Sequence, residues 1–229
     1  MAKITFILGG ARSGKSAFAE ELAKKYNDVV YIATAEIKDD EMRERIKAHR
    51  ARRPFNWKTI ESPFHVDEVI SNLNEKVGLV FIDCITLYIT NMLLSNEMSM
   101  SGGEQPFSPT VTKDDQNPLK SSFSKVGLGG IKKECEGEKT YLADCASIQR
   151  EILRQKQSQI LAEINKLSQV CRDSKAEVLI VSNEVGLGIV PDNAISRMFR
   201  DITGSANQIL ADEADEVYFM VAGIAQRIK

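Results

Sequence analysis

The chain lacks long hydrophobic runs, paired cysteines and a strong net charge. No apolar run approaches the roughly 20 residues that a membrane-spanning helix needs, and the apolar part of the N-terminal segment is too short for a signal peptide. The four cysteines form no CxxC pair, which argues against a zinc knuckle or a disulfide framework. With 30 basic and 32 acidic side chains, the net charge of −2 argues against a general nucleic-acid-coating protein. We therefore expect a soluble, cytoplasmic protein without a membrane span.

Short apolar runs alternate with longer helical patterns along the 229 residues. Hydrophobic residues make up 43% of the sequence, enough for a buried core, and runs this apolar are typical of strands covered on both faces. The pattern predicts a single α/β domain over residues 1–229, with a doubly wound, mostly parallel sheet and an antiparallel edge strand. We expect strands at residues 4–8, 29–33, 57–60, 79–82, 178–181, 217–221 and, at the edge, 224–228. We expect helices at residues 16–26, 39–52, 66–73, 87–95, 148–170 and 193–211.

The stretch from about residue 98 to residue 144 breaks this alternation. It is rich in Ser, Gly, Lys, Pro and Glu and only weakly patterned. A stretch of this length inside a compact domain is typical of a flexible insertion, and we favour a disordered loop over a functional lid.

A glycine-rich segment between the first strand and the first helix fits the pattern G-x-x-x-x-G-K-[ST]. Glycines let backbone N–H groups converge on phosphate oxygens, and the following helix adds its positive N-terminal dipole. Lys15 can reach the β- and γ-phosphates, and the Ser16 hydroxyl can ligate Mg²⁺. The segment, which we call the phosphate loop, consists of Gly9, Gly10, Ala11, Arg12, Ser13, Gly14, Lys15 and Ser16. Its place between a strand and a helix predicts a P-loop NTPase-like fold.

A carboxylate follows the apolar strand at residues 79–82. Asp83 stands where the acid that holds the metal of a P-loop protein belongs, so we predict Ser16 and Asp83 as magnesium ligands. A strand-end aspartate that caps the next helix is the alternative. Glu184, after the strand at residues 178–181, is a weaker candidate of the same kind.

One of the two histidines lies among cations. In the predicted helix 39–52, spacings of three and four place Ile46, His49 and Arg53 along one side. A neutral imidazole can attack the α-phosphorus of a nucleotide, and neighbouring cations would hold the triphosphate and depress the pKa of the ring. The alternative is a packing or surface residue, because a lone histidine is more often one of these. His65, near a helix start, is interpreted as structural.

Several segments of the sequence occur together in one known family. They are the phosphate loop, His49-Arg50 with Arg53-Pro54, Asp83-Cys84-Ile85-Thr86 and Asn183-Glu184-Val185-Gly186. Over residues 1–95 and 148–229 the sequence resembles the bifunctional adenosylcobinamide kinase / adenosylcobinamide-phosphate guanylyltransferase family, of the CobU type. The His-Arg-x-x-Arg-Pro and Asn-Glu-Val-Gly segments separate this family from other P-loop proteins.

The resemblance implies two reactions of late cobalamin biosynthesis, with GTP, ATP and Mg²⁺ as cofactors. A nucleoside triphosphate phosphorylates adenosylcobinamide. GTP then guanylylates a histidine, from which GMP passes to adenosylcobinamide phosphate and gives adenosylcobinamide-GDP. The family's nucleophile falls on His49, and Lys15 is the second residue that we expect to be catalytic. The nucleotide-binding positions fall on the phosphate loop and on Thr34, Ala35, Glu36, Arg50, Ala51, Arg52, Arg53, Glu61 and Asp83. The resemblance also implies a mostly parallel P-loop sheet and a homotrimer.

Two other functions are compatible with the phosphate loop. A monofunctional P-loop kinase for another small alcohol would transfer the γ-phosphoryl group without forming covalent GMP. A non-catalytic nucleotide-sensing module would bind nucleotide with negligible turnover. Neither accounts for His49 within an arginine cluster as well as the guanylyltransferase does.

Overall fold

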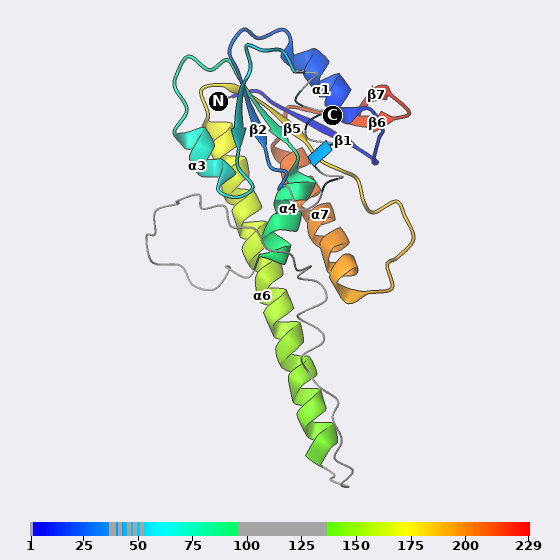
Figure 1. Cartoon of the computed structure of the whole chain (residues 1–229). Helices are drawn as coiled ribbons and strands as arrows, with labels where there is room; N and C mark the ends of the chain where they lie inside the picture. The colour runs from blue at the N-terminus through cyan, green and yellow to red at the C-terminus, as the bar shows by residue number, and fades with distance from the viewer. Residues whose placement is uncertain are drawn as a thin grey trace. The chain divides into compact units, whose positions relative to one another are not determined.

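The computed structural model describes residues 2–36, 40, 43–44, 47, 50, 53–95 and 137–229, with residues 137–150 as backbone only. Its strands form one seven-stranded sheet (Figure 1). The strands are β1 (Ile4–Gly9), β2 (Val29–Ala33), β3 (Lys58–Glu61), β4 (Leu79–Asp83), β5 (Glu177–Val181), β6 (Glu216–Val221) and β7 (Ile224–Arg227). The helices are α1 (Lys15–Ala23), α3 (Val66–Ser71), α4 (Ile85–Leu94), α6 (Gly137–Asp173) and α7 (Ala194–Glu213).

The strand order of the sheet is β3-β2-β4-β5-β1-β6-β7. Neighbouring strands are parallel except for the last pair, β6 and β7, which is antiparallel. The predicted α/β class, with a mostly parallel sheet and an antiparallel edge strand, is therefore confirmed. The observed strand ends differ from the predicted ones by one residue at most. The predicted helix 39–52 falls mostly on residues outside the described part of the chain.

The central strands bury side chains on both of their faces. Phe6 and Ile7 are neighbours in β1 and are fully buried, yet they belong to two different core clusters. Successive side chains of a strand point to opposite faces, so a strand covered on both sides reads as an unbroken apolar run. Helices α3, α4, α6 and α7 cover one face, whereas α1 and Trp57 cover the other.

Helix α6 packs on the first of these faces through one apolar stripe. Ile160, Ile164, Leu167 and Cys171 follow one another at spacings of four, three and four residues, and all four are fully buried. This spacing keeps side chains on one side of a helix. The helix predicted from this periodicity at residues 148–170 is part of α6, which begins earlier, at Gly137.

The chain divides into two compact units, Met1–Met98 with Leu153–Lys229 and Ser99–Ile152. The first unit contains the whole sheet. Residues 137–144, which we expected to belong to the insertion, are helical in α6. The rest of the expected insertion lies outside the described residues, so its flexibility stays a prediction. Among the described helices, none is long and apolar enough to cross a bilayer.

The strand order brings four strand ends to one edge of the sheet. Ala33 lies opposite Asp83, and Asp83 lies opposite Val181, at the ends of β2, β4 and β5. β1 pairs with β5 on the other side and ends at Gly9. In open parallel sheets, ligands bind outside the carboxyl ends of the strands. This edge is therefore where a site is expected.

Candidate functional site

The phosphate loop connects β1 to α1 through backbone conformations that favour glycine. Gly14 caps α1 with a φ of 97°, and its carbonyl accepts a hydrogen bond from the Phe18 N–H at 3.0 Å. A left-handed φ carries little steric cost for glycine and a larger one for other residues. The helix therefore starts with its free N–H groups facing the loop, which is the arrangement that binds anions.

The neighbouring segments hold the phosphate loop by backbone hydrogen bonds. The Gly223 N–H, in the turn between β6 and β7, donates to the Ser13 carbonyl at 2.9 Å. From the other side, the Glu184 N–H donates to the Gly9 carbonyl at 3.0 Å. A Cβ atom on Gly9 would lie 2.6 Å from the Met220 carbonyl oxygen, so the loop lies directly against β6.

Lys15 is buried at the start of α1 and faces the phosphate loop. Its side chain is in a residue only 7% exposed, and its Nζ donates to the Gly10 carbonyl at 2.6 Å. Burial lowers the pKa of this ammonium, and the nearby Cys84 and Asp83 partly oppose that shift. The Ser13 hydroxyl oxygen is also buried and has no hydrogen-bond partner among the described residues. A buried cation and an unpaired hydroxyl in one loop fit a phosphate group.

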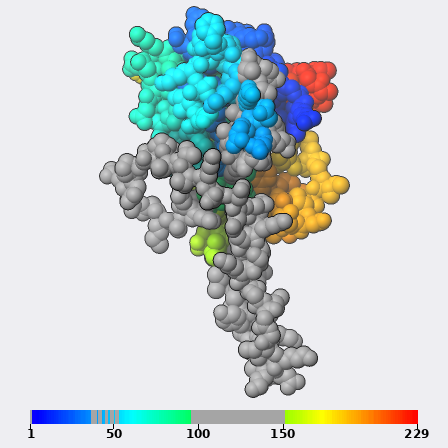
Figure 2. Space-filling model, in the orientation of Figure 1, coloured from blue at the N-terminus to red at the C-terminus, as the bar shows by residue number. Residues whose placement is uncertain are grey.

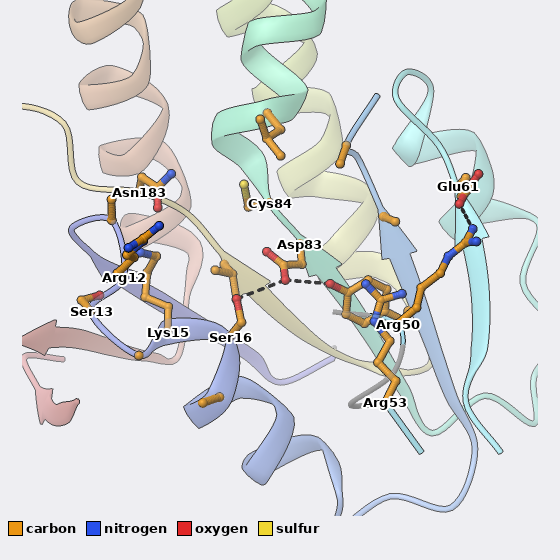
Figure 3. Close-up of a pocket in the computed structure, with 18 residues that line it drawn as sticks. Arg12, Ser13, Lys15, Ser16, Arg50, Arg53, Glu61, Asp83, Cys84 and Asn183 are labelled. Carbon is orange, nitrogen blue, oxygen red and sulfur yellow. Dashed lines mark hydrogen bonds and ion pairs between the residues drawn. The ribbon is translucent and has the colours of Figure 1, made fainter. Parts of the chain in front are cut away.

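Asp83 joins three elements at the end of β4. Its Oδ2 accepts a hydrogen bond from the Ser16 hydroxyl at 3.3 Å and another from the Tyr31 hydroxyl at 2.7 Å (Figure 3). The structure thus brings together the two predicted magnesium ligands. Within the described part of the chain, no group of three or more His, Cys, Asp or Glu side chains gathers as a metal site. Mg²⁺ commonly uses one or two carboxylates with phosphates and water, so the Ser16–Asp83 pair fits that ion.

Two arginines lie on the other side of Asp83 from the phosphate loop (Figure 3). The Arg53 guanidinium lies over the Tyr31 ring, with its Cζ 3.4 Å from the ring centroid. Arg50 forms an ion pair with Glu61. Burial raises the pKa of Tyr31, which keeps its hydroxyl neutral and able to donate to Asp83. The ring thus connects a cation on one face to a carboxylate at its edge.

A cavity of about 570 Å³ lies between these groups. Its walls are the phosphate loop, Tyr31, the arginine pair with Glu61, and the end of β4 with Asp83. This volume is within the range of small-molecule sites. The cavity has cations at both ends and a hydroxyl–carboxylate pair between them, so it can bind a polyphosphate and a divalent cation.

Most of the described residues that we predicted for the nucleotide site line this cavity. They are Ala11, Arg12, Ser13, Gly14, Lys15, Ser16, Ala35, Arg50, Arg53, Glu61 and Asp83. Gly9, Gly10, Thr34 and Glu36 are described but do not line it. His49, Ala51 and Arg52 lie outside the described residues.

Thr34 supports the site from behind instead of lining it. Its hydroxyl donates to the Cys84 carbonyl at 2.7 Å and accepts from the Cys84 N–H at 2.8 Å. Asn91 donates to the Thr34 carbonyl at 2.7 Å. Thr34 is fully buried, so it fixes the chain next to Asp83.

The weaker acidic candidate, Glu184, turns away from the cavity. Its Oε1 accepts the Gly186 N–H at 2.5 Å, and the residue is not part of the cavity wall. Its neighbour Asn183 lines the cavity instead. The sequence analysis did not assign a role to Asn183, Tyr31 or Cys84, although all three lie in the cavity wall.

The loop that follows β5 exposes apolar side chains. Leu187 is 82% exposed and Ile189 is 96% exposed. Figure 2 shows this loop in amber at the surface, below the red C-terminal end of the chain. An apolar surface therefore begins four residues after Asn183.

The whole chain matches one protein family. A family model described as cobinamide kinase / cobinamide phosphate guanyltransferase matches residues 5–228. The chain belongs to this family. It is 36% identical over 226 residues to the bifunctional adenosylcobalamin biosynthesis protein CobU of Escherichia coli, with 97% of this chain and 98% of that protein covered.

Two further relatives have the same coverage of this chain, 97%. The protein CobU of Salmonella typhimurium is 37% identical over 223 residues, with 98% of that protein covered. The protein CobP of Pseudomonas aeruginosa is 33% identical over 224 residues, with 95% of that protein covered. Both are named bifunctional adenosylcobalamin biosynthesis proteins.

Membership of the cobinamide kinase / cobinamide phosphate guanyltransferase family confirms the resemblance that the sequence motifs indicated. It also confirms the expected enzyme class, because the family joins a kinase and a guanylyltransferase. Both activities use nucleotide substrates, and the cavity is lined by a phosphate-loop motif of the kind that binds nucleoside triphosphates.

Proposed function

We propose that this protein phosphorylates adenosylcobinamide and then transfers GMP from GTP to adenosylcobinamide phosphate through a guanylylated His49. One observation carries the proposal: Arg50 and Arg53, which follow His49 closely in the sequence, lie in the same cavity wall as the phosphate loop. The position of these two arginines supports a role for the neighbouring His49 at the proposed triphosphate site. The family's two activities and the names of its relatives agree with this substrate pair.

In the kinase reaction, a hydroxyl oxygen of adenosylcobinamide attacks the γ-phosphorus, and the bond from that phosphorus to the bridging oxygen breaks. The nucleoside diphosphate leaves, and the hydroxyl proton passes to solvent. The N–H groups of the phosphate loop and the Lys15 ammonium hold the β- and γ-phosphates. Lys15 lies where its charge is most effective, because burial removes competing water from it.

In the guanylyltransferase reaction, a ring nitrogen of neutral His49 forms a bond to the α-phosphorus of GTP. The bond from that phosphorus to the β-phosphate oxygen breaks, and pyrophosphate leaves. A phosphate oxygen of adenosylcobinamide phosphate then attacks the same phosphorus, the N–P bond breaks, and adenosylcobinamide-GDP forms with free His49. Arg50 and Arg53 would stabilise the charge that develops on the α-phosphoryl oxygens.

We propose Ser16 and Asp83 as the residues that hold Mg²⁺. Their side chains are hydrogen-bonded to each other at 3.3 Å at the bottom of the triphosphate site. Bound there, the ion would neutralise charge on the β- and γ-phosphates. Tyr31 orients the Asp83 carboxylate through its own hydrogen bond.

Covalent labelling tests the proposal. Incubation with α-labelled GTP and Mg²⁺ should give a protein-bound label that is labile to acid and stable to base, as expected for a phosphoramidate. His49→Ala should abolish the label, because it removes the nucleophile. His65→Ala is the matched control, since it removes the only other histidine, one that lies at the start of α3, and should keep the label.

A label that survives His49→Ala would overturn the assignment of the nucleophile. Absence of any label in the unaltered protein, with γ-phosphoryl transfer intact, would indicate a monofunctional kinase. Nucleotide binding without turnover of either kind would indicate a nucleotide-sensing module. The homotrimer and the cytoplasmic location implied by the resemblance stay proposals.

A further inference from the structure

Asn183 occupies a distinctive place at the edge of the sheet. Strand β5 lies between β1, which leads into the phosphate loop, and β4, which ends in Asp83. β5 ends at Val181, and Asn183 lines the cavity two residues later. Figure 3 shows Asn183 on the same side of the cavity as Arg12 and Lys15.

The backbone of Asn183 is fixed by buried side chains. Its N–H donates to the Thr86 hydroxyl oxygen at 2.7 Å, and its carbonyl accepts from the Asn207 side chain at 3.1 Å. Thr86 and Asn207 are themselves buried, at 6% and 5% exposed. These bonds use both backbone groups of Asn183 and so hold its backbone at the cavity wall.

The carboxamide of Asn183 has no hydrogen-bond partner among the described residues. It is a neutral group with two N–H donors and a carbonyl acceptor. A donor that is already positioned and unpaired can bind a phosphoryl oxygen without giving up another bond. The group therefore suits a ligand in the cavity more than a role in folding.

We propose that the Asn183 carboxamide contacts the γ-phosphoryl group of the bound nucleoside triphosphate and is a catalytic residue of the kinase reaction. With nucleotide bound, Lys15 would hold the β- and γ-phosphates, and Ser16 and Asp83 would hold the metal that neutralises their charge. Asn183 follows β5, the strand between β1 and β4, and lines the same cavity as Lys15 and Asp83. Its N–H donors stabilise the equatorial oxygens as the phosphoryl group moves to the acceptor hydroxyl.

This inference depends on the kinase activity and on the proposed magnesium and phosphate positions, not on His49. In the kinase reaction the γ-phosphorus changes its bonds, and a contact to its oxygens bears on the rate. In the guanylylation of His49 the γ-phosphate leaves unchanged within pyrophosphate. Loss of the carboxamide should therefore slow the kinase reaction much more than the guanylylation of His49.

A binding experiment tests the contact. In a His49→Ala background, which prevents transfer of GMP, Asn183→Ala should weaken the affinity for a β,γ-imido nucleoside triphosphate about 10-fold, as loss of one charge-assisted hydrogen bond would. The affinity for the matching nucleoside diphosphate should stay unchanged. Asn165→Ala is the control, because Asn165 is exposed on α6 and bonds only within that helix. Equal losses for both nucleotides, or no loss for either, would overturn the inference.

A kinetic experiment tests the catalytic role. Asn183→Ala should lower kcat of the kinase reaction about 100-fold, as removal of one transition-state donor does, with KM for adenosylcobinamide little changed. The rate of covalent labelling with α-labelled GTP should change much less. An unchanged kinase kcat, or an equal loss in both rates, would overturn the inference. If the parent protein takes no label, the proposed guanylyl-histidine fails, while the kinase comparison still decides the role of Asn183.

Discussion

At the scale of single residues, the phosphate loop contains a buried positive charge, that of Lys15, which opposes folding. Lys15 is buried, its only hydrogen-bond acceptor among the described residues is the Gly10 carbonyl, and burial lowers its pKa. A lysine with a lowered pKa in the folded state costs stability at neutral pH. Stability is then regained as pH rises through the folded pKa towards the ordinary value of 10.5. A bound phosphate offsets this cost by pairing with the ammonium.

Lys15→Met should therefore stabilise the empty protein while removing nucleotide binding. Thermal unfolding at neutral pH should show a higher Tm without nucleotide than the parent protein has. Nucleotide at 100 times its Kd should raise the free energy of unfolding of the parent protein by about 2.7 kcal/mol, and this gain should disappear in the variant. Lys25→Met, at an exposed position just after α1, is the control and should keep that gain. A lower Tm for empty Lys15→Met would show that the buried charge does not oppose folding.

At the scale of elements, the phosphate loop depends on the β6–β7 hairpin. Gly223 in the hairpin turn donates to Ser13, and β6 lies so close to Gly9 that no side chain fits between them. The loop is thus shaped by a strand pair that lies more than 200 residues later in the chain. Its geometry depends on contacts with β6 as well as on its own glycines.

Gly9→Ala should disrupt this contact. The added methyl group would lie 2.6 Å from the Met220 carbonyl oxygen, a backbone atom that can move only with β6. We expect a loss of about 1–3 kcal/mol in the free energy of unfolding, as for other overpacked sites, together with weaker nucleotide binding. Urea unfolding measures the first quantity and calorimetric titration the second.

Gly10→Ala is the matched control for that experiment. A Cβ atom at Gly10 meets nothing within 4 Å among the described residues. Its free energy of unfolding should therefore stay close to that of the parent protein. Equal losses for the two variants would mean that contact with β6 is not what constrains the loop.

The sequence predicts the elements well where the local signal and the tertiary packing agree. The strands are found within one residue because burial on both faces leaves an unbroken apolar run. The start of α7, at Ala194, is found within one residue, and in the structure Asn193 caps the helix by accepting the Ser196 N–H at 2.7 Å. The start of α4 was predicted two residues late, because Cys84 precedes the helix without any side-chain cap.

The site is predicted less completely than the elements. Asp83 could be found because an acid after an apolar strand is a known metal-site signal. Asn183 lies two residues after the end of β5 and also lines the cavity, but a search for acids selects Glu184 beside it. Tyr31 could not be found, because an aromatic residue inside a strand is typical of a core. Its contact with Asp83 depends on the pairing of β2 with β4, which no local pattern encodes.

At the scale of the whole molecule, the candidate site lies at one end of the sheet, and a stabilising hydrogen-bond and ion-pair cluster lies at the other. The cavity lies at the carboxyl ends of the parallel strands. At the opposite end, Asp215 accepts the Ile4 N–H at 2.7 Å and pairs with Arg172 of α6 at 3.0 Å. The hydrogen bond from Ile4, followed by the interaction with Arg172, lowers the pKa of the Asp215 carboxyl.

Asp215→Asn should change how the free energy of unfolding depends on pH in the acid range, without changing the kinase rate. A carboxyl with a lowered pKa contributes stability above its ordinary value of 3.8 and loses that contribution as pH falls through the lower folded value. The variant should therefore be less stable than the parent at neutral pH, with a difference that shrinks below about pH 4. Urea unfolding across that pH range measures the difference, and Asp212→Asn, an exposed neighbour, is the control. A difference that stays constant with pH would contradict the assignment.

The pairing of β1 with β6 also fixes when the site can form during synthesis. A ribosome-bound chain that stops before residue 216 already contains the complete glycine-rich motif, both proposed magnesium ligands and the arginines. It still lacks the strand that lies against Gly9 and the turn whose amide binds Ser13. The chain should therefore become able to bind a triphosphate only late in translation, after nearly all of the binding residues have left the exit tunnel.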